Sequence, residues 1–177
     1  MKKLLFIISL CLSLCACGQS KIQDTFFGCK YGSSMAQVKK TLSKEGLVVH
    51  ENHNGLDVYD VSFGGYKFRK TSFSFVQNNF FHVCFSDNFK SFASAVFMLN
   101  SIKVGLAEKY AEYGSLHDMS SEDKYMYYIF EEDNNISVSM NKDRVESKDG
   151  ELFFYVELAY YNSKLADLYM KQTNDEL

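Results

Sequence analysis

Three features of the sequence predict an α+β fold, with helices packed on one face of an antiparallel sheet. Helical and strand-like hydrophobic periodicities alternate along the chain, short turn signals separate the strand segments, and 46% of the 177 residues are hydrophobic. Strands joined by tight turns pair antiparallel, and a helix with one apolar stripe buries it against a neighbouring element. The length fits a single domain, and sixteen Phe and twelve Tyr residues supply its core in the absence of Trp.

Residues 1–16 have the pattern of a secretory signal peptide. Lys2 and Lys3 precede an apolar run from Leu4 to Leu14. This run is shorter than the roughly 20 apolar residues that a membrane-spanning helix needs. We therefore expect it to direct secretion and to be removed from the mature chain.

The end of this segment, Leu14-Cys15-Ala16-Cys17, resembles the lipobox of bacterial lipoproteins. In that motif a branched apolar residue and two small residues precede the Cys that receives the lipid. The resemblance implies cleavage after Ala16 and lipidation of Cys17, so that acyl chains attach the protein to a membrane. A plain signal peptide with an incidental Cys is the alternative.

Within the same resemblance, the residues after Cys17 indicate which membrane holds the protein and which side it faces. In lipoproteins of bacteria with two membranes, Asp directly after the lipidated Cys commonly retains the protein in the inner membrane, and Gly18 stands there instead. The resemblance therefore implies the outer membrane, and the absence of an acidic cluster just after Gly18 favours an orientation facing the periplasm. We expect a lipidated N-terminus and tether over residues 17–25, followed by a single α+β domain over residues 26–177.

The charge balance argues against a nucleic-acid partner. Nineteen Lys and Arg residues stand against 22 Asp and Glu residues, which gives a net charge of −3. Binding to phosphates depends on an excess of basic side chains. The chain also contains no Pro, which excludes proline-rich recognition segments.

The first expected element is a helix over residues 34–45. Ser34 and Gln37 have the spacing of a capping box, in which each side chain bonds to the backbone N–H of the other residue. Val38 and Leu42 fall on one helical face, and Gly46 supplies the left-handed residue that ends many helices.

Strands separated by turns follow this helix. Residues 59–63 alternate between apolar and polar side chains, with Tyr59 on the apolar side, and Gly64-Gly65 marks the next turn. Residues 72–76 form a second alternating segment. Asn78-Asn79 is then the expected two-residue turn to a return strand, because Asn tolerates positive φ.

A long helix is expected from residue 89 to residue 110. Its apolar residues recur at intervals of three, four or seven positions and so fall on one face. They are Phe89, Phe92, Val96, Leu99, Leu106 and Tyr110, with Ala95 and Ile102 widening the stripe. Lys103 interrupts the stripe, Gly105 weakens the helix by about 1 kcal/mol relative to Ala and permits a kink, and Gly114 ends it.

Two strands are expected around a turn at residues 133–135. They cover residues 125–132 and 136–141. In the second strand Ser137 and Ser139 alternate with apolar residues, which indicates one face in contact with water.

The C-terminal part combines a loop, a strand and a helix. The charged segment 142–150 predicts the loop, and the alternation over residues 152–160 is the strongest strand signal in the chain. A short helix over residues 164–171, capped by Ser163, closes the chain.

The order of these elements suggests two tandem units, each a helix followed by three or four antiparallel strands. The turns Asn78-Asn79 and Asn134-Asn135 lie 56 positions apart, and the helix starts near residues 34 and 89 are similarly spaced. The residues themselves barely match, so a chance similarity of spacing is the alternative. The pattern favours one continuous α+β domain over two separate ones.

Two cysteines, Cys29 and Cys84, remain after Cys17. In an oxidising periplasm they can form a disulfide, which would stabilise the fold by about 4 kcal/mol in the chain-entropy model. The alternative is that both are buried as small hydrophobic residues. His82 shares a strand face with Cys84, but nucleophilic catalysis also needs a positive field around the thiol, so the spacing indicates little by itself.

The sequence contains no complete ligand set for a metal or a cofactor. His50 and His53 lie near Asp57 in a turn, without the further ligands that zinc requires. The acidic clusters at residues 122–123 and 131–133 lack the spacing of a calcium loop. No Gly-rich phosphate loop or nucleophile elbow occurs, so we expect no cofactor, no metal and no catalytic site.

Residues 28–46 resemble a helix of small periplasmic lipoproteins, those of the outer-membrane assembly type and of the β-lactamase-inhibitor-like fold. The resemblance lies in Gly28, the cap at Ser34, Val38 and Leu42. In those proteins the sheet or its loops bind a protein, which implies a non-enzymatic protein-binding or scaffold module with a partner in the cell envelope. Aromatic residues on both faces of the expected strands indicate either a sheet covered on one face and partly on the other, or an exposed aromatic face that binds a partner or an apolar ligand. A second interpretation is therefore a carrier of a lipid or other apolar ligand between the long helix and the sheet.

Overall fold

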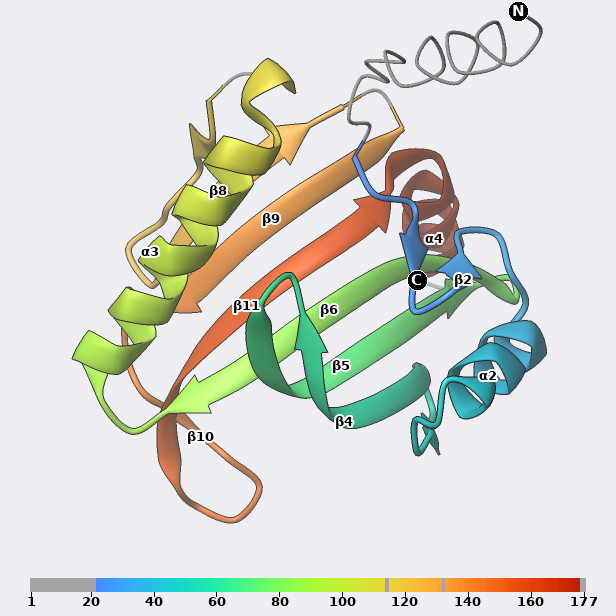
Figure 1. Cartoon of the computed structure of the whole chain (residues 1–177), viewed down its shortest axis with the longest axis horizontal. Coiled ribbons are helices and arrows are strands. Elements are labelled where there is room, and N and C mark those ends of the chain that lie inside the picture. Colours follow the sequence, from blue (N-terminus) through green and yellow to red (C-terminus); the bar gives the residue numbers. More distant parts are fainter. Residues whose placement is uncertain (1–21, 114, 132, 176–177) are drawn as a thin grey trace, which may run out of the picture.

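The computed structural model describes residues 22–113, 115–131 and 133–175. The predicted signal peptide, Cys17 and the expected helix end at Gly114 lie outside these ranges. Within them, no helix combines the length and the apolar character needed to cross a membrane. The described residues form an α+β structure, an open antiparallel sheet with three α-helices, as the sequence predicts (Figure 1).

The main sheet of the described chain has nine strands. Eight follow one path in the order β3-β4-β5-β6-β11-β9-β8-β7, and β10 pairs with β11 beside that path. The long strands β6 and β11 form the central antiparallel pair. In chain order the strands are β3 (His50–Asn52), β4 (Gly55–Phe63), β5 (Tyr66–Val76), β6 (Asn79–Phe89), β7 (His117–Asp118), β8 (Lys124–Phe130), β9 (Asn134–Asn141), β10 (Val145–Glu146) and β11 (Leu152–Asn162).

One helix precedes the strands of each half of the sheet. Helix α2 (Met35–Lys44) precedes β3 to β6, and α3 (Phe92–Lys109) precedes β7, β8, β9 and β11. The two Asn-containing turns, however, do not correspond. Asn78 lies in the turn between β5 and β6, the third and fourth strands after α2. Asn134-Asn135 follows the turn between β8 and β9, the second and third strands after α3. The equivalence predicted from their spacing is therefore wrong.

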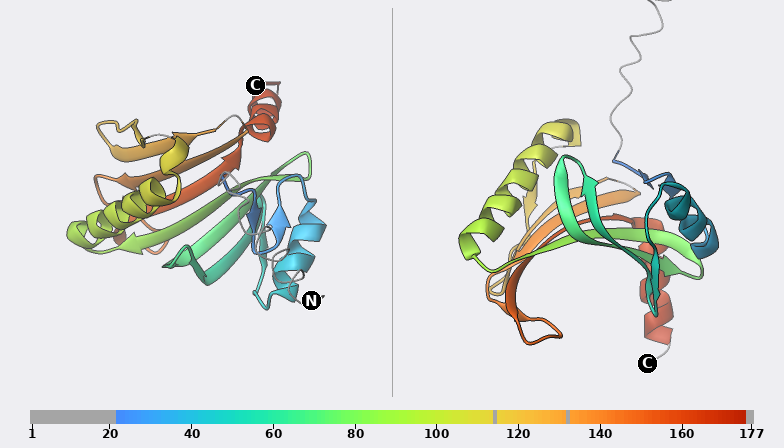
Figure 2. Two further views of the ribbon diagram at one scale, coloured as in Figure 1. Left: turned by 45° about the horizontal axis from the view of Figure 1, so that its top comes forward. Right: turned by 60° about the horizontal axis from the view of Figure 1, so that its bottom comes forward.

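The helices lie on both sides of the sheet, not on one face as the sequence predicts. In Figure 1, α2 and α3 lie in front of the sheet together with the small hairpin of β1 (Thr25–Phe26) and β2 (Cys29–Lys30). Helix α4 (Ser163–Asp175) lies on the opposite side, as the right-hand view of Figure 2 shows. We call the side of α2 and α3 the front face and the opposite side the rear face.

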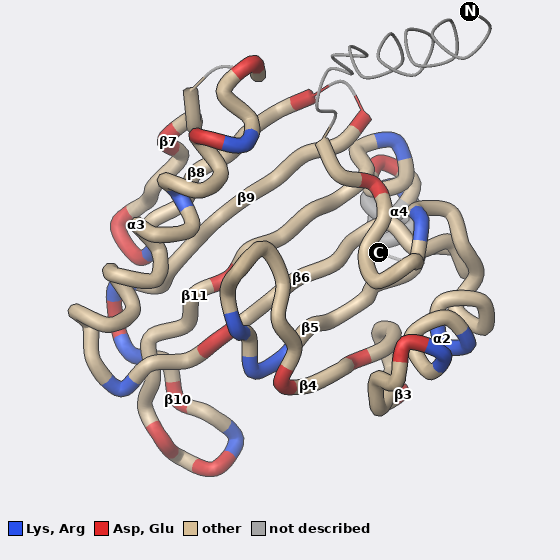
Figure 3. The backbone as a smooth tube through the Cα atoms, in the orientation of Figure 1, with Lys and Arg blue, Asp and Glu red and all other residues tan. Residues whose placement is uncertain are grey.

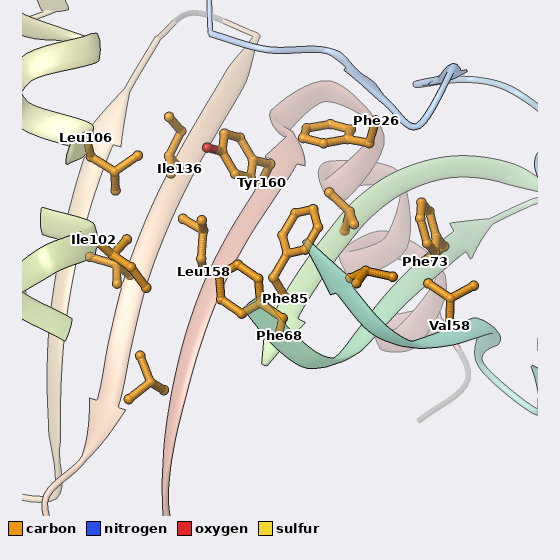
Figure 4. Packing of buried hydrophobic residues seen from close by; sticks show 14 of the residues in the cluster. Phe26, Val58, Phe68, Phe73, Phe85, Ile102, Leu106, Ile136, Leu158 and Tyr160 are labelled. Atoms are coloured by element: carbon orange, nitrogen blue, oxygen red, sulfur yellow. The ribbon is translucent and has the colours of Figure 1, made fainter. Parts of the chain in front are cut away.

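The hydrophobic core fills the front face (Figure 4). Val38 and Leu42 of α2 and Ile102 of α3 are at most 1% exposed, and they belong to the same cluster as alternate residues of the strands. The strand residues of this cluster include Leu56, Val58, Phe73, Val83, Phe85, Ile136, Val138, Met140, Val156, Leu158 and Tyr160. Phe26 of the β1–β2 hairpin is fully buried, and its ring lies 5.0 Å from that of Tyr160.

The β4–β5 hairpin bends over this core. Val58 and Val61 are buried, whereas Tyr59 and Asp60 between them are exposed. The side-chain alternation changes phase there because Asp60 has a left-handed backbone, with φ of 54°. The predicted inward position of Tyr59 is therefore wrong, since this side chain is 47% exposed.

Local signals at the first helix and the first hairpin turn are confirmed to within one residue. Ser34 and Gln37 form the predicted capping box, in which Ser34 Oγ accepts from Gln37 N at 3.3 Å and Gln37 Oε1 accepts from Ser34 N at 2.8 Å. Gly46 has a positive φ of 82°. The β5–β6 turn consists of Gln77 and Asn78, both at positive φ, one position earlier than predicted.

The boundaries of the two later helices differ from the predicted ones. Phe89 ends β6, and α3 begins three residues later at Phe92. The side chain that caps α4 belongs to Asn162, not to Ser163, because Asn162 Oδ1 accepts a hydrogen bond from Leu165 N at 3.1 Å.

The domain begins earlier than the sequence predicts. Ile22 is only 2% exposed, and its N–H donates to Glu131 Oε2 at 3.2 Å. Thr25 pairs with Lys30 in the β1–β2 hairpin. Residues 22–25, which we expected in the tether 17–25, therefore belong to the packed domain.

Candidate functional site

The rear face of the sheet is polar where the front face is apolar. Residues paired across antiparallel strands share a face, so the register traces a row with one residue from each of eight strands. This row is His50, Asp57, Ser72, Cys84, Ala159, Ser137, Tyr128 and His117. Small side chains occupy its centre, and larger polar and aromatic ones its ends.

The neighbouring rows of the rear face have a similar composition, rich in Ser, Asn and aromatic residues. Their members on β5, β6, β8, β9 and β11 are Lys70, Ser74, His82, Ser86, Asn88, Lys124, Met126, Phe130, Asn135, Ser139, Asn141, Tyr155, Glu157 and Tyr161. Hydroxyl and amide groups on a β-sheet offer hydrogen bonds from fixed positions, and the aromatic rings offer rigid apolar area.

An aromatic patch lies at the β7–β8 edge of the rear face. The rings of Tyr128 and Phe130 stack at a centroid distance of 5.2 Å and an interplanar angle of 7°, and the His117 ring lies 5.5 Å from that of Phe130. Phe130 is 48% exposed. Their paired residues on β9 are Asn135 and Ser137. Asn135 is 7% exposed and bonds to Glu131 N and Ser163 Oγ. The half-buried Ser137 is therefore the polar group beside the patch.

Near the β3 edge of the sheet, the negative charge of Asp57 is balanced by Lys70. The residue is 6% exposed, its Oδ1 accepts from Ser72 Oγ at 2.7 Å, and its Oδ2 lies 3.0 Å from Lys70 Nζ. Burial opposes ionisation of this carboxyl, but hydrogen bonds from Ser72, Lys70 and Asn52 outweigh burial and lower its pKa. Asp57 is therefore ionised at neutral pH.

A second ion pair connects β8 and β11 on the same face. Lys124 Nζ lies 3.1 Å from Glu157 Oε2, which also accepts a 3.5 Å hydrogen bond from Ser139 Oγ. The charges of the rear face are thus paired, and its central strands show few charged residues in Figure 3 compared with the loop after β10.

Two hollows lie where loops border the rear face. One hollow of about 320 Å³ is lined by Asp57, Lys70 and Ser72 and also by Lys148, which lies in the loop between β10 and β11. The right-hand view of Figure 2 shows the sheet arching over this side, with the β10 loop and α4 at its margins. A second hollow, of about 500 Å³, is lined by His53, Ser74 and His82 among others.

Cys29 and Cys84 are both free thiols, so the disulfide that the sequence left open is not formed. Cys29 belongs to the front-face core, where its Sγ lies 3.8 Å from the carbonyl oxygen of Val38. Cys84 lies on the rear face between Ser72 and Ala159. Because the sheet separates the two side chains, they cannot pair in this fold.

The environment of Cys84 opposes formation of a thiolate. Burial, with a smaller contribution from the charge of Glu157, raises the pKa of Cys84 to about 12. His82 shares the rear face, as expected, and burial lowers its pKa while Glu157 opposes that shift. A nucleophilic Cys needs a lowered pKa, so this pair lacks the electrostatics that such a role requires. Burial likewise raises the pKa of Cys29 to about 11.

The histidines near Asp57 do not assemble with it into a metal centre. His50 pairs with Asp57 across β3 and β4, but the Asp57 carboxylate is occupied by Ser72 and Lys70. Among the described residues, no group of three or more His, Cys, Asp or Glu side chains is placed to hold a metal ion.

A separate cavity of about 310 Å³ lies between α3 and the sheet, on the front face. Its apolar wall includes Ile102 and Leu106 of α3 and Leu158 of β11, and the bent β4–β5 hairpin closes one side. Gln23 and Lys109 add polar groups to its lining. This volume is at the lower end of the roughly 300–1,000 Å³ typical of ligand pockets.

Sequence reasoning did not identify the rear face as a site. Its signal was present as Ser residues at alternate strand positions, such as Ser72 and Ser74 in β5 and Ser137 and Ser139 in β9. A face in contact with water is predicted for the second pair alone. Joining the two pairs into one surface requires the strand order, because β6 and β11 lie between them.

Comparison with known proteins identifies no relative of this chain. No protein-family model matches the sequence, and searches of the curated proteins and of the solved structures found no match.

Proposed function

We propose that this chain is a lipid-anchored protein of the bacterial outer membrane that faces the periplasm and binds another envelope protein through its rear face. In this proposal it is a non-enzymatic binding or scaffold module. The observation that carries the proposal is the rear face itself, a broad polar and aromatic surface presented by a rigid sheet.

The composition of the rear face supports recognition of a protein. Tyr, Ser and Asn dominate it, and these residues also dominate antibody paratopes, where aromatic rings act as rigid anchors and small polar groups adapt to the partner. The Tyr128–Phe130 stack is such an anchor, with Phe130 48% exposed and Ser137 beside it. Aromatic residues are enriched in protein interfaces, and charged residues are depleted from their centres.

Support for the anchor comes from the lipobox-like sequence that ends at Cys17. Replacement of Cys17 by Ser is expected to abolish incorporation of labelled fatty acid and to release the protein from the membrane fraction. Unchanged labelling of this variant would contradict the assignment.

We also propose that the chain is built from two tandem units. The support is the order of elements, since α2 precedes one half of the sheet and α3 the other, with β6 and β11 meeting at the centre. In this interpretation the rear face is one continuous surface to which both units contribute.

Site-specific crosslinking tests the rear face directly. The photoreactive residue benzoylphenylalanine is placed at position 130 in the full chain, and the cells are irradiated. The matched control is position 48, because Val48 is 73% exposed and lies between α2 and β3. We expect one discrete adduct from position 130 and none from position 48.

The substitution Tyr128→Ala removes the other half of the stack and is expected to weaken the adduct. Truncating an interface hot spot costs about 2 kcal/mol or more, which is roughly a 30-fold loss of affinity. The thermal transition of the variant, measured in parallel, shows that it is folded. Equal adducts from positions 130 and 48, or an unchanged adduct in the folded variant, would refute the proposal.

The cavity between α3 and the sheet supports a second candidate function, a carrier of a small apolar ligand. Leu158, Ile102 and Leu106 supply the apolar wall that such a ligand needs. Mass spectrometry of organic extracts of the purified protein tests it. A carrier would yield one stoichiometric apolar compound, and Leu106→Trp, which fills the cavity, would lose that compound.

A further inference from the structure

The outer surface of α3, on the side away from the sheet, is apolar along most of the helix. Phe97 is 76% exposed and Val104 is 58% exposed. Seven residues, about two helical turns, separate them, so both point in the same direction. Ala93, Asn100 and Ala107 are also exposed and share that side. We call these five residues the α3 outer face.

From Ala93 to Ala107 the α3 outer face contains no charged side chain, and Glu108, one turn after Val104, is the first exposed charge on that side. Lys103 is the one charged residue between Phe92 and Ala107, and it is directed to the sheet. Its Nζ lies 3.4 Å from the centroid of the Tyr127 ring in β8, a cation–π contact. Surface helices ordinarily place charged and polar residues opposite the stripe that faces the core, whereas Asn100 is the one polar side chain among these five residues of α3.

The N-terminal part of the described chain lies beside the C-terminal end of α3. Lys109 Nζ donates to Gln23 Oε1 at 3.4 Å, and Gln23 and Lys109 both line the cavity next to Leu106. Figure 1 shows β1 and the last turns of α3 on the same side of the sheet. Cys17 precedes Ile22 by five positions in the sequence, and five residues span at most about 18 Å.

We propose that the α3 outer face rests on the lipid surface of the membrane that holds Cys17. The inference rests on the proposed function, because the lipid on Cys17 brings the bilayer within reach of the helix. Phe97 and Val104 then enter the boundary between headgroups and acyl chains, as the apolar sides of interfacial helices do. The contact also orients the domain, since the rear face lies on the other side of the sheet and is directed away from the membrane.

The absence of Trp from the chain permits a direct test. The full chain is produced in a bacterial host that lipidates secreted proteins, and it carries Phe97→Trp as its single tryptophan. The purified protein is reconstituted into vesicles of phosphatidylethanolamine and phosphatidylglycerol, with and without brominated acyl chains. Val104→Trp provides a second reporter on the same face, and Val48→Trp is the control, because Val48 is exposed near α2.

We expect the tryptophan emission of the Phe97→Trp and Val104→Trp proteins to shift to shorter wavelength on reconstitution and to be largely lost with brominated lipid. The Val48→Trp protein is expected to keep an emission typical of water and to show no loss. Emission typical of water at both α3 positions in a lipidated protein would overturn the inference. A shift that appears without lipid and grows with protein concentration would overturn it as well, because a second copy would then cover the helix.

The mass of the N-terminal peptide separates this inference from the proposed anchor. An acylated Cys17 together with unquenched α3 reporters refutes the membrane contact and leaves the anchor in place. A Cys17 without acyl chains refutes the anchor. In that case quenching of the α3 reporters on added vesicles still supports lipid binding by the helix, and unquenched reporters refute it.

Discussion

The front and rear faces of the sheet are made by the same strands but differ in burial, polarity and the interactions that hold them. On β11, Val156, Leu158 and Tyr160 face the core and are at most 2% exposed, whereas Glu157 and Ala159 between them face the rear. The front face is held by packed rings and aliphatic groups, and the rear face by hydrogen bonds and ion pairs. Because side chains alternate along a strand, one set of positions forms the core while the intervening set forms the rear face, through which we propose that the protein binds a partner.

The largest effect is expected from a substitution in the front face. Phe85 is fully buried, and its ring stacks on Phe63 at 4.1 Å. Phe85→Ala is expected to lower the free energy of unfolding by about 3–5 kcal/mol, because it removes buried apolar area and leaves a cavity. Urea unfolding followed by circular dichroism measures this change.

The next residue along β6 is the matched control for this prediction. Ser86 lies on the rear face, where its Oγ makes a long 3.4 Å hydrogen bond to the carbonyl oxygen of Lys70. Ser86→Ala is expected to change the free energy of unfolding by no more than about 0.5 kcal/mol. A loss at Ser86 as large as that at Phe85 would mean that the two faces do not divide stability and recognition in this way.

A smaller effect is expected at Asp57, the buried carboxylate of the rear face. Asp57→Ala removes the hydrogen bonds from Ser72 and Lys70 and is expected to cost about 1.5–3 kcal/mol at neutral pH, as for hydrogen bonds to charged groups. Because the folded-state pKa is lowered, this stability is present above the ordinary Asp pKa of about 3.9. It is lost as the pH falls through the lower folded-state pKa.

The pH dependence separates the charge of Asp57 from its packing. The difference in unfolding free energy between the wild type and Asp57→Ala is expected to shrink as the pH falls below about 4, where Asp57 is protonated first in the unfolded state and, at lower pH, in the folded state. Glu122→Ala, at an exposed carboxylate, provides the control. A difference that stays constant down to the lowest pH at which the protein remains folded would assign the effect to packing alone.

Predictions from sequence succeeded where the interactions are local. The capping box of Ser34 and Gln37 involves residues three positions apart, and Ser137 and Ser139 lie as predicted on the face of β9 opposite the core, although Ser139 is only 4% exposed and not in contact with water as expected. Both therefore depend on information that a short window contains. The α+β class follows in the same way, from the order of such segments.

Predictions failed where residues distant in sequence decide the structure. The bend at Asp60 places Phe63 over Phe85 and the Tyr66 hydroxyl against α3, and neither contact is visible in the alternation of residues 59–63. The side of the sheet that α4 covers and the separation of Cys29 from Cys84 depend on strand order and register. The rear face as a continuous site depends on the same information.

The smallest effect concerns Gly105, where the bent hairpin meets α3. A Cβ atom at this position would lie 3.0 Å from the Tyr66 hydroxyl, which donates to the Ser101 carbonyl at 2.7 Å. Gly105→Ala would gain about 1 kcal/mol of helix propensity, and the close contact is expected to offset this gain, leaving a net change of no more than about 0.5 kcal/mol. In a Tyr66→Phe background the contact is absent, and Gly105→Ala is expected to stabilise by about 0.5–1 kcal/mol. Urea unfolding of the four proteins gives the coupling between the two sites. Equal stabilisation in both backgrounds would show that the hairpin tip does not press on α3, and that the front face does not require glycine at this position.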